Sequence, residues 1–165
     1  EGWVGRLSDR LASERIAARI VNASISGDTT SGGRARLPAL LEKHRPDVVV
    51  IELGANDALR GQSMAATENN LDAMVRAAQA TKAKVLLLGM QVPPNYGAAY
   101  ADQFAAVFRS VAQSTGAALV PFFLAGVADG PDALALFQPD RIHPNEQAQP
   151  ILERNVWPQL RMLIK

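Results

Sequence analysis

The sequence predicts an α/β fold in which a parallel sheet carries helices on both faces. The hydrophobic spacing of the 165 residues alternates between a helical period and short apolar runs. Two of these runs, residues 47–53 and 85–90, are continuous and rich in Val, Ile and Leu, as in strands that are buried on both faces. Stretches of helical spacing separate the runs, and this alternation is typical of a parallel sheet.

The individual elements follow from local patterns. Trp3, Leu7 and Leu11 recur at helical spacing and predict a first helix. A helix near residues 37–41 must end before Pro46, because a proline disfavours helical backbone in the residue that precedes it. The expected order is helix 3–11, strand 16–23, helix 37–41, strand 47–53, helix 64–80, strand 85–90, helix 104–111, strand 117–121 and a helix after Pro144.

Composition excludes several classes of function. The net charge is +1, so the sequence lacks the basic face by which proteins bind nucleic acid. Cysteine is absent, which excludes disulfides, thiolate zinc sites and a cysteine nucleophile. The apolar runs are far shorter than the ~20 residues of a membrane-spanning helix. No cofactor is expected, and two histidines offer little for a transition-metal site.

Glycine and polar residues follow the predicted strands at their carboxyl ends, where parallel sheets bind ligands. Gly27 follows the strand at 16–23 and can turn the backbone so that N–H groups face an anion. Asn56 follows the strand at 47–53, and its amide offers two donors to an oxyanion. Each residue also has a structural interpretation: Gly27 as a turn glycine, and Asn56 or Asp57 as a helix cap.

Residues 139–144 carry the clearest chemical pattern. Asp140 precedes His143 by three residues, and a carboxylate at that spacing can fix the tautomer of an imidazole that acts as general base. Prolines on both sides restrict the backbone. An Asp and a His at this spacing also occur often in proteins with a purely structural role or exposed to solvent. As metal ligands the two residues would need a third donor, which the sequence does not place.

Six segments, which occur in order along essentially the whole chain, point to one known family. They are residues 21–29, 37–41, 52–61, 93–97, 121–123 and 142–144. Together they resemble the SGNH (GDSL-type) serine hydrolases, and within them the bacterial thioesterase I, lysophospholipase and arylesterase group. The resemblance implies a three-layer, flavodoxin-like fold and the hydrolysis of carboxylic esters and acyl thioesters. It also implies a small acyl substrate and a periplasmic or secreted location, and we expect a monomer.

The resemblance implies roles for individual residues. His143 would be the general base, and Asp140 would orient it. Gly27 would supply a backbone N–H to the oxyanion hole, and Asn56 would supply its side-chain amide. The residues expected to contact the substrate are Leu59, Val92 and Pro93.

One family motif is not found in these residues: the Gly-Asp-Ser block whose serine is the nucleophile. Residues 27–29 read Gly-Asp-Thr, but only one helix and one strand fit between Gly27 and Asn56. The family places the strand that carries the oxyanion glycine between its first block and the asparagine block, and that strand would then be missing. Thr29 is therefore not expected to be the nucleophile. We expect residues 1–165 to form a single domain that lacks its first central strand and its serine and is inactive alone.

Two other functions stay open from the sequence. A non-catalytic relative that keeps the pocket would act as a binding module, and the missing serine favours this interpretation. A carbohydrate O-acetyl esterase would use the same catalysis on another ester. The apolar segment at residues 92–94 fits an acyl chain better than a sugar.

Overall fold

The computed structural model describes residues 2–25, 27–92, 94–129, 133–136 and 144–164. The chain forms two compact units. The sheet unit comprises Ser24–Phe122 and Gln159–Lys165, and the helical unit comprises Glu1–Ala23 and Phe123–Pro158. The boundary at the C-terminal end falls inside one helix, next to Pro158.

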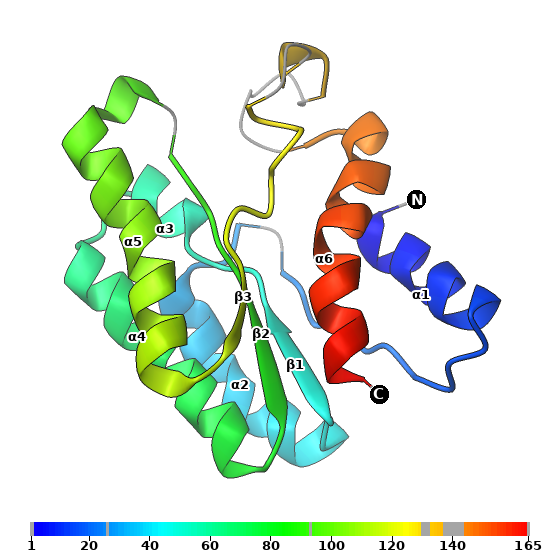
Figure 1. Cartoon of the computed structure of the whole chain (residues 1–165). Coiled ribbons are helices and arrows are strands. Elements are labelled where there is room, and N and C mark those ends of the chain that lie inside the picture. The colour runs from blue at the N-terminus through cyan, green and yellow to red at the C-terminus, as the bar shows by residue number, and fades with distance from the viewer. Residues whose placement is uncertain (1, 26, 93, 130–132, 137–143, 165) are drawn as a thin grey trace. The chain divides into compact units, whose positions relative to one another are not determined.

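The sheet unit is built on three parallel strands in the order β1-β2-β3 (Figure 1). They are β1 (Val48–Ile51), β2 (Lys84–Leu88) and β3 (Ala118–Val120). The register pairs Val49 with Val85 and Leu87 with Leu119. Because β2 has a strand on each side, its last four residues are buried. Parallel pairing brings the three carboxyl ends to one edge of the sheet, which is where a site is expected.

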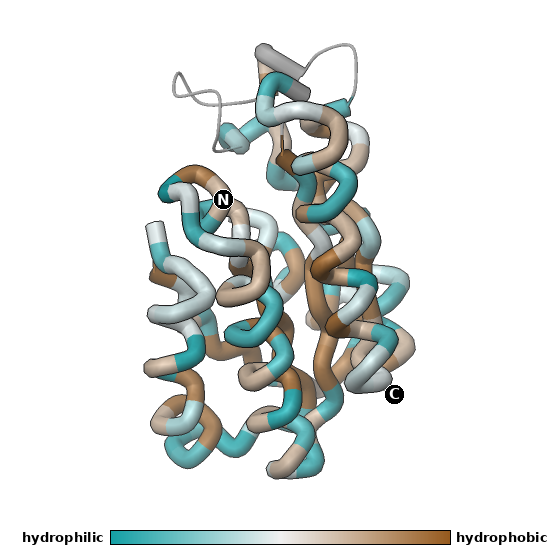
Figure 2. Tube along the Cα trace, turned by 90° about the vertical axis from the view of Figure 1, so that its left-hand side faces the viewer, coloured by the Kyte–Doolittle hydropathy of each residue, from teal (hydrophilic) through white to brown (hydrophobic). Residues whose placement is uncertain are grey.

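The helices of the sheet unit pack against one another and onto the sheet. They are α2 (Thr30–His44), α3 (Ala55–Leu59), α4 (Met64–Ala80) and α5 (Ala98–Thr115). Helix α4 packs between α2 and α5 and against β2. Its Leu71 and Val75 are fully buried, as are Phe104 and Phe108 of α5, whose rings meet edge to face at 5.5 Å. In Figure 2 the helices alternate between hydrophilic and hydrophobic colours, as amphipathic helices do.

The helical unit holds α1 (Trp3–Ser13) against the first part of α6 (Gln149–Leu163). Short 3₁₀ turns at Ala133–Leu136 and Glu146–Ala148 belong to the same unit. Arg10 on α1 forms a two-pronged ion pair with Glu153 on α6, at 2.7 and 2.9 Å. The guanidinium of Arg10 also lies 5.1 Å from the ring centroid of Trp157. Since Glu153 is buried, this ion pair is the polar centre of the helix contact.

Most expected elements are confirmed, but the strand expected at residues 16–23 is wrong. The structure assigns no strand there, and the sheet has three strands within the described ranges. A strand requires a neighbour to accept its backbone hydrogen bonds. The N–H of Ile16 instead bonds to the carbonyl of Leu11, after a left-handed residue at Arg15 ends α1. Val21 then lies exposed rather than in a core.

Three further differences concern element boundaries and burial. Helix α2 begins at Thr30, well before the Leu stripe, and accommodates Pro38 inside. Helix α3 is a short element that the sequence pattern did not predict. Strand β1 was expected to be buried on both faces, but Val48–Val50 are half-buried. The reason is position: β1 lies at the edge of the sheet, and its outer side pairs with no strand among the described residues.

The ion pair between α1 and α6 gives a stability prediction. Arg10→Ala leaves the buried Glu153 carboxylate without its partner, so we expect the free energy of unfolding to fall by about 2 kcal/mol. The matched control is Arg76→Ala, which breaks a more exposed ion pair with Asp72 within α4 and should cost about 0.5 kcal/mol or less. Urea unfolding followed by circular dichroism measures both. Equal losses in the two variants would contradict the role given to Glu153.

Candidate active site

The turn at Gly27 lies immediately before α2, and its shape is set by Asp28. Gly27 is left-handed, with φ of 78°, and the N–H of Asp28 bonds to the carbonyl of Ile25 at 3.1 Å. The carboxylate of Asp28 accepts the N–H of Thr29 at 3.0 Å and pairs with Arg36 at 2.6 Å. A Cβ at Gly32 would lie 2.0 Å from Oδ1 of Asp28. Glycine at position 32 is therefore what lets this carboxylate lie over the start of α2.

Asn56 and Asp57 are placed by α3, which begins just after β1. Gly54 precedes the helix with φ of 125°, and a Cβ there would lie 2.9 Å from Cζ of Phe108. Only glycine combines that backbone angle with such close packing against α5. The tight turn puts Asn56 and Asp57 in the first turn of α3. The alternative that either residue caps this helix is wrong, because the N-cap is Gly54.

Four hydrogen bonds join the Gly27–Thr30 segment to the Asn56–Arg60 segment. The amide Nδ2 of Asn56 donates to the carbonyl of Asp28 at 3.0 Å. The N–H and hydroxyl of Thr30 donate to the two carboxylate oxygens of Asp57. Nη2 of Arg60 donates to the carbonyl of Gly27 at 2.9 Å. We call these two linked segments the cradle.

The cradle orients Asn56 for a second hydrogen bond. A side-chain amide nitrogen carries two hydrogens, and the carbonyl of Asp28 accepts one of them. The other can donate to an oxygen of a substrate. The structure thus brings Asn56 and the Gly27 turn, both predicted from the sequence, to one place.

The remaining predicted site residues fall into two groups. Leu59, at the end of α3, is 40% exposed, and Val92, after β2, is half-buried. Thr29, the hydroxyl residue of the Gly-Asp-Thr sequence, is the N-cap of α2 and accepts the N–H of Gly32 at 3.3 Å. The residues that lie outside the described ranges are Asp140, His143 and Pro93.

Several contacts of the cradle were not predicted from the sequence. The Asp28–Arg36 ion pair could have been found from the sequence, because eight residues span about two helical turns and an acidic and a basic residue at that spacing can meet at the start of α2. The bonds from Thr30 and Thr67 to Asp57 join residues 27 and 10 positions apart, and no short motif marks them. Within the described ranges no cluster of three or more His, Asp or Glu residues is arranged to hold a metal ion, and no helix combines the length and apolar character of a membrane span.

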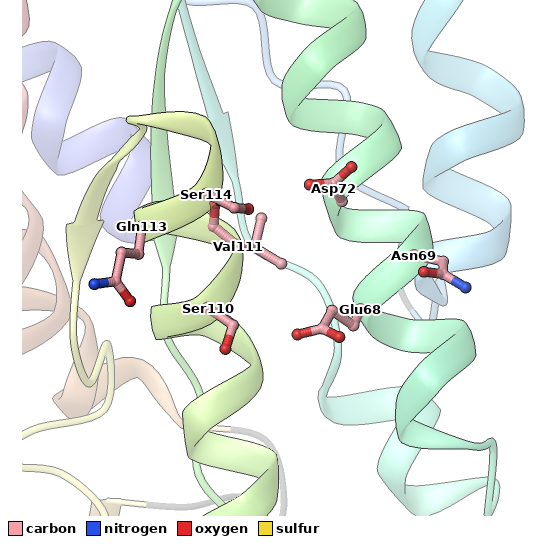
Figure 3. Close-up of a pocket in the computed structure, with 7 residues that line it drawn as sticks. All are labelled: Glu68, Asn69, Asp72, Ser110, Val111, Gln113 and Ser114. Atoms are coloured by element: carbon pink, nitrogen blue, oxygen red, sulfur yellow. The ribbon is translucent and has the colours of Figure 1, made fainter.

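A groove lies elsewhere in the sheet unit, between α4 and α5 (Figure 3). This groove has a volume of about 540 Å³, and its lining is mixed polar and apolar. Its lining residues are Glu68, Asn69, Asp72, Ser110, Val111, Gln113 and Ser114. None of the residues predicted for the site belongs to it.

Comparison with known proteins decides the family. Residues 1–150 match the model of the GDSL-like lipase/acylhydrolase family. The chain belongs to this family. It is 53% identical over 164 residues to the esterase TesA of Pseudomonas aeruginosa, a match that covers 99% of this chain and 80% of that protein. It is 40% identical over 162 residues to the Escherichia coli thioesterase 1/protease 1/lysophospholipase L1, covering 98% of this chain and 75% of that protein.

Solved structures agree with this assignment. A crystal structure of TesA superposes with a TM-score of 0.94 at 54% identity, covering 98% of this chain and 88% of the other. The psychrotrophic esterase EstA from Pseudoalteromonas, inhibited by monoethylphosphonate, gives 0.89 at 39% identity, with coverage of 98% and 86%. The α/β class and the parallel sheet predicted from the sequence are therefore confirmed as those of SGNH hydrolases.

Glu52, which follows β1, gives a pH prediction. The protein around the Glu52 carboxyl raises its pKa from 4.5 to about 7 by desolvation, but the residue is exposed to solvent, so the effect on stability is smaller than this pKa alone implies. The folded chain holds this proton more tightly than the unfolded chain. The contribution of Glu52 to stability is thus fully present below pH 4.5 and is lost as the pH rises to about 7.

Glu52→Gln should flatten the pH dependence of unfolding between these limits. The measurement is urea unfolding of both proteins at several pH values from 4.5 to 8. Glu42→Gln, at an exposed position of α2, is the matched control for the loss of one carboxylate. Parallel profiles for the wild type and Glu52→Gln would show that Glu52 does not titrate in this window.

Proposed function

We propose that this chain supplies the oxyanion hole and the general base for hydrolysis of carboxylic esters and acyl thioesters. The observation that carries the proposal is the cradle. Its hydrogen bonds hold the amide of Asn56 beside the Gly27 turn. The names of relatives support the substrate class, since they include an esterase, an arylesterase and a thioesterase/lysophospholipase.

The proposed reaction proceeds through an acyl-enzyme. A serine hydroxyl attacks the acyl carbonyl carbon while His143, oriented by Asp140, takes its proton. The carbonyl oxygen becomes an oxyanion, which accepts hydrogen bonds from the N–H of Gly27 and the amide of Asn56. The intermediate then expels the alcohol or thiol, which receives the proton from His143. Water hydrolyses the acyl-enzyme by the same steps.

The serine is the part of this mechanism that the 165 residues do not supply. Thr29 is occupied as a helix cap, which supports the expectation that it is not the nucleophile. We propose that the hydroxyl comes from a Gly-Asp-Ser block outside these residues, and that residues 1–165 alone are inactive. A periplasmic or secreted location stays a prediction from the family resemblance, and action as a monomer stays a prediction as well.

Active-site labelling tests whether the serine nucleophile lies outside residues 1–165. A fluorescent alkyl phosphonate forms a covalent bond with an activated serine, and an esterase of this fold is inhibited by a phosphonate. We expect the 165-residue chain to remain unlabelled, and an enzyme that carries both this chain and the serine to be labelled. Labelling of the 165 residues alone would contradict the proposal. An unlabelled longer enzyme would favour the binding-module alternative.

Substitution of Asn56 tests the oxyanion role. In the enzyme that carries the serine, Asn56→Ala should lower kcat about 10²–10³-fold, since one oxyanion donor is lost, with a smaller change in KM. The matched control is Asn69→Ala, which removes a side-chain amide of the same kind from the groove between α4 and α5 and should leave kcat unchanged. Steady-state kinetics with a p-nitrophenyl ester measures both. Wild-type kcat in Asn56→Ala would rule out its assignment.

A further inference from the structure

We propose that Asp57 is a positioning residue of the oxyanion site: its buried carboxylate sets the place of the Asn56 amide relative to the Gly27 turn. This inference rests on the proposed function, because it concerns the same site. Asp57 lies one residue after Asn56, and its side chain is completely buried. Burying a carboxylate costs free energy of folding unless hydrogen-bond donors surround it. The donors around Asp57 therefore show which parts of the chain its side chain holds together.

The partners of Asp57 come from two other helices. Oδ1 accepts the N–H of Thr30 at 2.8 Å, at the start of α2. Oδ2 accepts the hydroxyl of Thr30 and, at 2.8 Å, the hydroxyl of Thr67 on α4. The N–H of Thr30 belongs to the first turn of α2, where no backbone partner within the helix exists. The negative charge also lies at the positive end of the α2 dipole.

A second layer fixes the direction of these bonds. Nδ2 of Asn70 donates to the hydroxyl oxygen of Thr30 at 3.1 Å, which leaves the hydroxyl hydrogen of Thr30 for Asp57. Thr67 is 2% exposed and Thr30 is completely buried. Water therefore has little access to replace either donor, and the carboxylate keeps three protein donors in a fixed arrangement.

The position of this network couples it to the oxyanion donors. The bond between Thr30 and Asp57 lies beside the bond between Asp28 and Asn56: it is two residues further along one segment and one residue further along the other. If Asp57 loses a donor, α3 can shift relative to the start of α2. The amide of Asn56 then moves relative to the Gly27 turn. Misplacement of a catalytic group by about 1 Å can cost as much as 10²-fold in rate.

Thr67→Val is the sharpest test because it removes one donor to Asp57 while keeping the shape of the side chain. In the enzyme that carries the serine, we expect kcat to fall roughly tenfold with KM within about twofold, because the transition state alone uses the oxyanion donors fully. Thr67→Ser, which restores the hydroxyl, should recover most of the rate. Thr115→Val is the matched control: its hydroxyl bonds to the carbonyl of Val111 on α5, outside the network, so kcat should not change.

A double-mutant cycle with Asn56→Ala separates positioning from a general loss of stability. If Thr67 acts through Asn56, then Thr67→Val should cost little further kcat once the Asn56 amide is gone. The thermal midpoint of each variant is measured alongside. An equal fold-loss with and without the amide would overturn the positioning role while leaving the proposed function intact. So would an unchanged kcat in a destabilised Thr67→Val. If Asn56→Ala itself keeps wild-type kcat, the oxyanion assignment fails first, and the positioning role fails with it.

Discussion

The hydrogen bonds between the Gly27–Thr30 segment and the Asn56–Arg60 segment determine the geometry of the candidate site. Thr30 and Asp57 are 27 residues apart in sequence, and their contact holds the start of α2 against α3. The contact between Asp28 and Asn56 follows from the same approach of the two segments. These bonds therefore hold the turn at Gly27 and helix α3, which carry the two proposed oxyanion donors, next to each other.

An oxyanion hole accelerates a reaction most when its donors are in place before negative charge develops on the substrate. Moving the donors into position during the reaction would cost free energy and offset the stabilisation of the transition state. The hydrogen bond from Asn56 to the carbonyl of Asp28 gives the proposed donor Asn56 such a fixed position. Asp28 uses its carbonyl for Asn56 and its carboxylate for Arg36 and the start of α2. A single residue thus connects the start of α2 to the amide of Asn56, the proposed oxyanion donor. The fold of the family and the names of its esterase relatives agree with this chemistry.

The sequence predicts the α/β class, the helix at 64–80 with its observed bounds, and the placement of Gly27 and Asn56 near each other. The class and the helix follow from hydrophobic period, and Asn56 follows β1 as the rule for parallel strands predicts. Gly27 follows no strand among the described residues, so only the family resemblance predicted its place beside Asn56. The strand at 16–23 was wrong because a strand depends on a neighbour, which local pattern does not reveal. Helix α3 was missed because five residues are too few to show a period. The Asp57 network joins residues distant in sequence, so only the fold reveals it.

The most direct test of the central claim is a crystal structure of the serine-carrying enzyme after reaction with an alkyl phosphonate. The phosphonyl oxygen occupies the place of the oxyanion. The account predicts that this oxygen lies about 2.7–3.1 Å from both the backbone nitrogen of Gly27 and Nδ2 of Asn56. A phosphonyl oxygen that contacts neither nitrogen would contradict it.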